Sequence, residues 1–86
     1  MSHWASPRFW EAYEGLPENA RRRADRAFAL LKENPQHPSL NLKRVGRYWS
    51  ARVGLHYRAV GIRQGEDISW FWIGSHAEYD RLLGQL

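Results

Sequence analysis

Residues 68–76 constrain the fold of this chain more than any other segment. The run Ile68-Ser69-Trp70-Phe71-Trp72-Ile73 is apolar on both faces of a strand, which is typical of a central strand that is covered on both sides. Ser75 and Glu78 follow at the spacing of a capping box, so a helix is expected to begin directly after the strand. The rest of the chain must therefore supply neighbouring strands and covering helices.

Two helices are predicted before the sheet. Ser6 and Pro7 match an N-cap and a first helical residue, and an aromatic stripe follows until Gly15. The second helix has an apolar stripe and ends at Asn34, because the residue before a proline avoids the α region. That stripe consists of Ala20, Ala24, Ala27, Phe28 and Leu31. The short turn between the helices predicts an antiparallel helical hairpin.

Strands are predicted over residues 42–45, 48–53, 57–62 and 68–73, with a polar turn at 64–67. The first two segments could also form a single strand kinked at Gly46. The chain is thus predicted to be one α+β domain over residues 1–86. An N-terminal two-helix hairpin packs on a three- to four-stranded antiparallel sheet, and a short C-terminal helix follows.

The composition narrows the classes of function. The chain has 86 residues and a net charge of +4, which favours anionic partners such as RNA, DNA, anionic lipid or an acidic protein. The alternative is a basic domain without a specific partner. Cysteine is absent, which excludes disulfides, thiolate zinc sites and thiol catalysis. No apolar run approaches the roughly 20 residues that cross a bilayer, and no signal peptide is visible, so a cytoplasmic location and no membrane partner are expected.

No metal or cofactor is expected. The histidines are scattered through the chain, and no carboxylate accompanies one of them at a spacing typical of a metal site. The sequence also lacks a glycine-rich phosphate loop and a nucleophile elbow.

The order of motifs resembles the RelE/ParE superfamily, the toxins of type II toxin–antitoxin systems. The motifs after the helical hairpin are Leu40-Asn41-Leu42-Lys43-Arg44-Val45, Trp49-Ser50-Ala51-Arg52-Val53, His56-Tyr57-Arg58-Ala59-Val60 and Ile73-Gly74-Ser75-His76. The resemblance extends from about residue 7 to residue 83. Two features depart from the family pattern. Residues 1–5 barely supply the usual first strand, and no carboxylate lies between Glu33 and Glu66.

The resemblance implies a ribosome-dependent mRNA endonuclease that a partner antitoxin holds inactive. It assigns the cations at the scissile phosphate to Arg58 and Arg52, and the proton-transfer groups near the C-terminus to His76 and Tyr79. One branch of the superfamily instead poisons DNA gyrase and cuts no RNA. A third alternative is an RNA-binding or protein-binding relative that has lost toxicity.

The residue chemistry supports the assignment of the cations. An arginine can hold two phosphate oxygens and never deprotonates, although Arg58 could also be a surface residue paired with a carboxylate. Arg52 depends on the hairpin register. A two-residue loop at Gly54 and Leu55 places Arg52 and Arg58 on opposite faces, whereas a three-residue loop that includes His56 places them side by side. The second register is preferred because it directs more apolar residues toward the core.

His76 is the favoured general acid or base, because imidazole titrates near neutral pH. Tyr79 shares a helix face with it and could donate a hydrogen bond or stack on a base. Both could instead be structural. The proposal requires a concave pocket in which the guanidinium groups and the imidazole converge around a space for an oxyanion.

Further RNA contacts are predicted at Lys43, Arg44, Arg47 and His56. The first three form a basic cluster that would contact the backbone without reading sequence, or would simply protect a strand edge. The helical hairpin and the basic sheet are expected to offer a groove for an acidic, partly disordered antitoxin that folds on binding. The expected partners are thus that antitoxin and mRNA on the ribosome.

Overall fold

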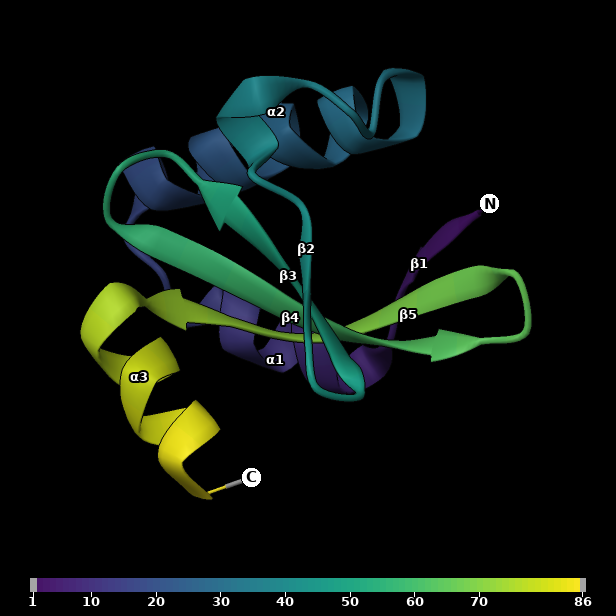
Figure 1. Ribbon diagram of the computed structural model, residues 1–86. Coiled ribbons are helices and arrows are strands. Elements are labelled where there is room, and N and C mark those ends of the chain that lie inside the picture. Colours follow the sequence, from purple (N-terminus) through teal and green to yellow (C-terminus); the bar gives the residue numbers. More distant parts are fainter. Residues whose placement is uncertain (1, 86) are drawn as a thin grey trace.

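The computed structural model describes residues 2–85, which form three helices and a five-stranded mixed sheet. In chain order the elements are β1 (His3–Ala5), α1 (Pro7–Glu14), α2 (Glu18–Glu33), the 3-10 turn η1 (Pro38–Leu40), β2 (Lys43–Val45), β3 (Tyr48–Val53), β4 (Tyr57–Gln64), β5 (Asp67–Ser75) and α3 (His76–Gln85) (Figure 1). The strand order is β1-β5-β4-β3-β2. The predicted α+β class is confirmed.

The sheet has more strands than the sequence predicts. Residues 3–5, which the sequence barely marks as a strand, form β1 and pair in parallel with β5. All other neighbouring strands are antiparallel. β5 therefore has a neighbour on each side, as its apolar faces predict.

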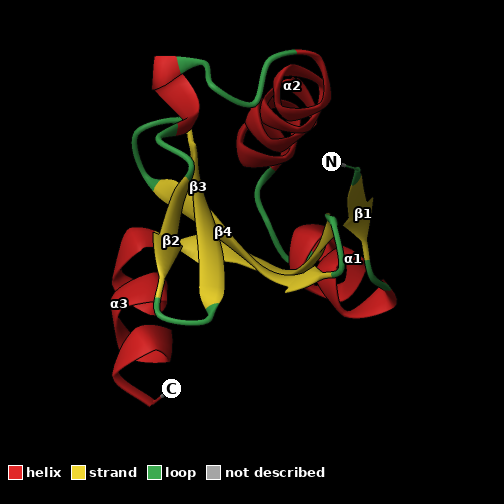
Figure 2. Cartoon of the chain, turned by 45° about the vertical axis from the view of Figure 1, so that its right-hand side comes forward, coloured by secondary structure: helices red, strands yellow, loops and turns green. Residues whose placement is uncertain are grey.

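The helix boundaries follow the predicted signals. Ser6 caps α1, where its Oγ accepts a hydrogen bond from the Phe9 N–H at 3.3 Å, and Gly15 ends the helix. The helix α2 ends at Glu33, directly before Asn34 and Pro35. Tyr13 Oη donates to Asp25 Oδ1 at 2.8 Å and ties α1 to α2. Figure 2 shows both helices on one side of the sheet and α3 on the other.

Two tight loops fix the register of β2, β3 and β4. Val45 pairs with Tyr48 across a two-residue turn in which Gly46 has a φ of 61°. The alternative of one kinked strand is therefore wrong, because β2 and β3 form a hairpin. The next loop has three residues, since Val53 pairs with Tyr57. The preferred three-residue register is confirmed.

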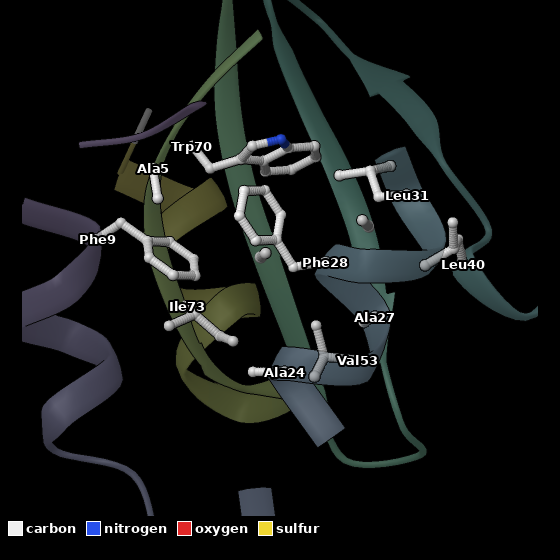
Figure 3. Close-up of a pocket in the computed structure, with 12 residues that line it drawn as sticks. Ala5, Phe9, Ala24, Ala27, Phe28, Leu31, Leu40, Val53, Trp70 and Ile73 are labelled. Atoms are coloured by element: carbon white, nitrogen blue, oxygen red, sulfur yellow. The ribbon is translucent and has the colours of Figure 1, made fainter. Parts of the chain in front are cut away.

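The core lies between the helices α1 and α2 and the face of the sheet that they cover, which we call the first face. Small residues on both layers let α2 approach the sheet closely: Ala20 and Ala24 on the helix, and Ala51 and Ala59 on the strands, are all buried. Larger side chains, including Phe9, Leu31, Trp70 and Ile73, fill the remaining space. Figure 3 shows these side chains around a cavity of about 30 Å³, whose apolar walls offer a water no hydrogen-bond partners.

The histidine of β1 makes the fold sensitive to acid. His3 is buried, and its Nδ1 accepts a hydrogen bond from Trp70 Nε1 at 3.1 Å. Burial lowers the pKa of His3 below its ordinary value. Because the unfolded chain binds this proton more readily, the stabilising contribution is present above about pH 6.5 and is lost as the pH falls.

We expect the melting temperature to fall more between about pH 7.5 and pH 5 for the wild type than for a His3→Gln variant. The difference should be a few °C, because about 1 kcal/mol corresponds to roughly 4–8 °C in a domain of this size. Thermal unfolding followed by circular dichroism measures it. Since the two proteins differ only at residue 3, equal pH dependence would contradict the role given to His3.

Candidate functional site

Arg58 is the centre of the second face of the sheet, the face opposite α1 and α2. Only 3% of the residue is exposed, and its Nε donates to Ser50 Oγ at 2.9 Å. Its guanidinium carbon lies 5.1 Å from the centroid of the Tyr79 ring. Among the described residues, no acceptor reaches the buried Nη2 atom. The alternative of a surface arginine paired with a carboxylate is therefore wrong.

Within residues 2–85, this arrangement leaves a cation buried without a counter-charge. Burying a charge is costly unless hydrogen bonds and an opposite charge offset the lost hydration. The serine hydroxyl and the tyrosine ring offset only part of that cost for Arg58. Nη2 therefore has the donor capacity to bind an anionic oxygen.

Arg52 lies directly opposite Arg58 in the register of β3 and β4. It is exposed, whereas its neighbour is buried. Like charges in directly opposite positions destabilise a sheet. A shared anionic ligand would turn this repulsion into joint binding, so the pair is a physical reason to look for such a ligand.

The N-terminus of α3 places two of the predicted residues. Ser75 and Glu78 form the predicted capping box: the Ser75 N–H donates to Glu78 Oε1 at 3.0 Å, and the Glu78 N–H donates to Ser75 Oγ at 3.1 Å. The first of these bonds lowers the pKa of Glu78. The His76 N–H donates to the carbonyl of His56 at 2.9 Å and holds the helix start against the β3–β4 loop.

The side chains of His76 and Tyr79 lie together on α3. Their ring centroids are 5.9 Å apart, and Tyr79 is buried over Arg58 while 58% of the His76 side chain is exposed. Asp80 Oδ1 lies 4.0 Å from His76 Nε2 at i,i+4, so the expectation that no carboxylate accompanies a histidine at helical spacing is wrong for this pair. Arg52, Arg58, Tyr79 and His76 thus form one continuous chain of neighbours on the second face.

The predicted basic residues are less closely grouped. Lys43, Arg44, Arg47 and His56 are all exposed. Successive strand residues point to opposite faces, so Lys43 shares the face of Ser50, and Arg44 points to the other. Arg47 lies over the Tyr48 ring, with 5.4 Å between its guanidinium carbon and the ring centroid.

A groove lies at the edge of the sheet beside α2. It has a volume of about 370 Å³ and is lined by Arg23, Arg26, Ala27, Leu30, Ser39, Leu40, Arg52, Gly54 and Leu55. We call it the arginine groove. Leu55 at its rim is 81% exposed, and no carboxylate is among the lining residues.

Arg58, Tyr79 and His76 lie together as predicted, but Arg58 and Tyr79 are buried and do not line an open pocket in the described part of the chain. Neither the core cavity nor the arginine groove is lined by Arg58, His76 or Tyr79. The Tyr79 ring covers the guanidinium instead. The reason is that α3 folds back onto the second face, over β4 and β5, directly after the strand ends.

Two residues of the site were missed by sequence reasoning. Ser50 holds Arg58, and strand alternation could have placed both on one face. Gly74 pairs with Arg58, and the Trp72 indole lies where a Cβ of residue 74 would be, at 2.4 Å. The Trp72 side chain would have to move to admit a Cβ at position 74, and the sequence does not show the conformation of that side chain.

Across residues 2–85 no group of three or more His, Cys, Asp or Glu side chains is placed to bind a metal ion. In the same range, no helix has the length and apolar character needed to span a bilayer.

Comparisons with known proteins identify the family. The model of the ParE-like toxin domain matches residues 18–81. No curated protein sequence matches the chain. Several solved structures are similar in fold, including the three that follow. A chain of the RelB-RelE antitoxin-toxin complex from Methanococcus jannaschii has a TM-score of 0.70 at 18% identity, covering 91% of this chain and 96% of that chain.

YafQ from Escherichia coli has a TM-score of 0.70 at 13% identity, with 91% of this chain and 96% of that chain covered. The YoeB/ParE toxin from Agrobacterium tumefaciens has a TM-score of 0.64 at 16% identity, with 88% and 99% covered. At these identities the likeness supports the fold alone. Because the family model spans well over half of its length, the chain belongs to the ParE-like toxin domain family, within the RelE/ParE superfamily of toxins.

Proposed function

We propose that this toxin is a metal-independent endoribonuclease that cleaves mRNA on the ribosome. The observation that carries the proposal is the buried guanidinium of Arg58, whose Nη2 lacks a partner among the described residues, next to Tyr79 and His76. Similar folds include the isolated RelE toxin of Escherichia coli, with a TM-score of 0.62.

The reaction would be an attack of the ribose 2′-OH on the adjacent phosphorus. A base accepts the hydroxyl proton, cations stabilise the charge on the phosphoryl oxygens, and an acid protonates the leaving 5′ oxygen. Arg58 and Arg52 suit the cationic role, since they are paired on one face. His76 suits proton transfer because it is exposed and Asp80 lies within one helical turn of it.

Substrate binding requires a movement of Tyr79 or of the whole α3. Arg58 is 3% exposed and Tyr79 is 4% exposed, so a phosphate has no path to Nη2 in the conformation described. We propose that the entering nucleotide displaces the tyrosine ring and takes its place over the guanidinium. The phenol then lies beside the reacting phosphate, where it can donate a hydrogen bond.

Primer extension on a message translated in a purified ribosomal system tests the proposal. Wild-type protein should produce breaks that depend on ribosomes, and His76→Ala should reduce them by about 100-fold, in the range typical of a lost general acid or base. His37→Ala is the matched control, because His37 is exposed and bonds locally to Ser39. Full cleavage by the His76 variant would contradict its assignment.

The closed state of Arg58 favours one second candidate, a toxin that inhibits gyrase by binding and cuts no RNA. Such an inhibitor needs no path to a buried guanidinium. Inhibition of DNA supercoiling, together with an intact translated message, would support this candidate and overturn the nuclease proposal.

We also propose an acidic antitoxin segment as the protein partner, bound in the arginine groove. The groove combines Arg23, Arg26 and Arg52 with exposed apolar surface at Leu55, and such a surface fits a peptide with apolar anchors and flanking carboxylates. The structural neighbours include antitoxin–toxin complexes.

Charge reversal at Arg23 and Arg26 should weaken binding of a co-expressed acidic antitoxin by roughly tenfold or more. Arg8→Glu is the control, since Arg8 lies outside the groove. Titration of the purified proteins in a calorimeter measures the affinity. An unchanged dissociation constant for the double variant would place the antitoxin elsewhere.

A further inference from the structure

The second face of the sheet carries three aromatic side chains that the core does not use. Tyr48, Phe71 and Trp72 are only partly buried, and none of them belongs to the core cluster or packs against it. The ring centroids of Tyr48 and Phe71 are 6.0 Å apart in an edge-to-face contact. Packing of the core therefore does not explain why these three residues are aromatic.

A β-bulge brings two of these rings to the same face. Val60 pairs with Trp72, but its neighbour Gly61 pairs with Trp70, so Phe71 is an extra residue in β5. In a regular strand, successive side chains point to opposite faces. The bulge lets Phe71 contact Tyr48 while Trp72 lies over Gly74 on the side of Arg58. Bulges of this kind redirect side chains next to functional sites.

Cations surround the aromatic rings. The guanidinium carbon of Arg47 lies 5.4 Å from the centroid of the Tyr48 ring, and that of Arg8 lies 5.9 Å from the centroid of the Phe71 ring. Lys43 is exposed on the same face of β2. Residues 34–65, which include β2, β3 and β4, contain no carboxylate, whereas Glu78 of α3 lies beside Trp72 at Gly74. The electrostatic field over Tyr48 and Phe71 therefore favours a polyanion.

We propose that Tyr48, Phe71 and Trp72 form a stacking surface for the bases of single-stranded RNA that lead to the Arg58 site. Unpaired bases stack on aromatic rings while cations contact the phosphates, and this combination tolerates any sequence. Trp72 faces Val60, which is two residues from Arg58 in β4. A strand with its phosphate at Arg58 therefore lays the neighbouring bases over Trp72, then Phe71 and Tyr48.

This inference depends on the proposed function for the choice of RNA as ligand, but its test does not depend on cleavage. The probe is a fluorescent 12-nucleotide oligouridylate with 2′-O-methyl groups, which block attack by the 2′ oxygen. Anisotropy titrations at low salt measure its affinity for the full chain.

A Tyr48→Leu, Phe71→Leu double variant keeps the apolar surface and every cation but removes the π-faces. Its dissociation constant should rise by roughly tenfold or more, since each stacked base contributes between about fivefold and 150-fold. The slope of affinity against salt should stay unchanged, because phosphate contacts set that slope. Arg47→Gln should reduce the slope.

Trp4→Leu is the matched control, because Trp4 is 61% exposed on the edge strand β1. Unchanged RNA affinity in the double variant, with wild-type thermal stability, would overturn the proposal. So would tighter binding of a poly-glutamate peptide than of the oligonucleotide, which would assign this face to an acidic protein. If the double variant does not fold, Phe71→Leu alone gives the same comparison.

The outcomes separate this inference from the proposed function. RNA binding that depends on the rings, without breaks in primer extension, would support the stacking surface and overturn the nuclease. Ribosome-dependent breaks with unaltered binding by the double variant would overturn the stacking surface alone.

Discussion

Replacing Arg58 with lysine is expected to lower the rate of message cleavage by about 100-fold or more, in the range seen when one donor to a transition-state anion is lost. Lysine keeps the positive charge, so the electrostatic environment of the sheet changes little. It lacks the planar fork, in which Nε bonds to Ser50 while Nη2 stays available for a phosphate oxygen. Cleavage is measured by primer extension on a translated message.

Arg63→Lys is the matched control for this experiment. Arg63 lies on the same strand, but it is exposed and its Nε donates to the carbonyl of Gly65 in the β4–β5 turn. Its replacement should leave cleavage unchanged. Equal melting temperatures for both variants would show that the loss is not due to unfolding, and full cleavage by the Arg58 variant would refute the phosphate role.

Local signals in the sequence predicted most element boundaries. Ser6 and Pro7 began α1 as expected, and Asn34 before Pro35 ended α2. These signals act within a few residues, so a sequence shows them directly. The three-residue loop after Val53 was also predictable, because only that register directs Ala51, Val53 and Ala59 together into the core.

Features that depend on distant segments were not predictable. The strand β1 has only three residues, which are too few to show the alternating pattern of a strand. Its pairing with β5 joins residues more than sixty positions apart in the sequence. The bulge at Phe71 lies in a run of aromatic residues. This run has no alternation of apolar and polar residues, so the sequence does not show that one residue is extra. Both features follow from tertiary packing.

The candidate site was also predictable only in part. Sequence reasoning selected Arg52, Arg58, His76 and Tyr79, and the structure places them as neighbours. It did not foresee that Arg58 is buried, because burial depends on α3 folding back over the second face. The type of a residue and its position in a strand indicate which chemistry its side chain can perform. Whether a substrate can reach that side chain depends on elements from distant parts of the sequence.

Trp70→Ala is expected to destabilise the fold by about 3–5 kcal/mol, the typical cost of removing a large aromatic side chain from a core. Trp70 is 2% exposed, lines the core cavity and donates its indole N–H to His3. The variant loses this burial, enlarges the cavity and leaves a buried imidazole nitrogen without its partner. In a small domain with about 5–15 kcal/mol of stability, the loss corresponds to a fall of roughly 12 °C or more in melting temperature.

Two further variants identify the cause of that loss. Trp4→Ala removes the same side chain from a position that is 61% exposed, so its melting temperature should change little. Trp70→Phe keeps most of the buried aromatic surface but cannot donate to His3. Its melting temperature should lie between those of the other two variants. If Trp70→Ala and Trp4→Ala unfolded at the same temperature, the stability of the sheet would not depend on the contact between β5 and the helical layer. In that case, contacts on the second face would have to hold Arg58 and α3 in position.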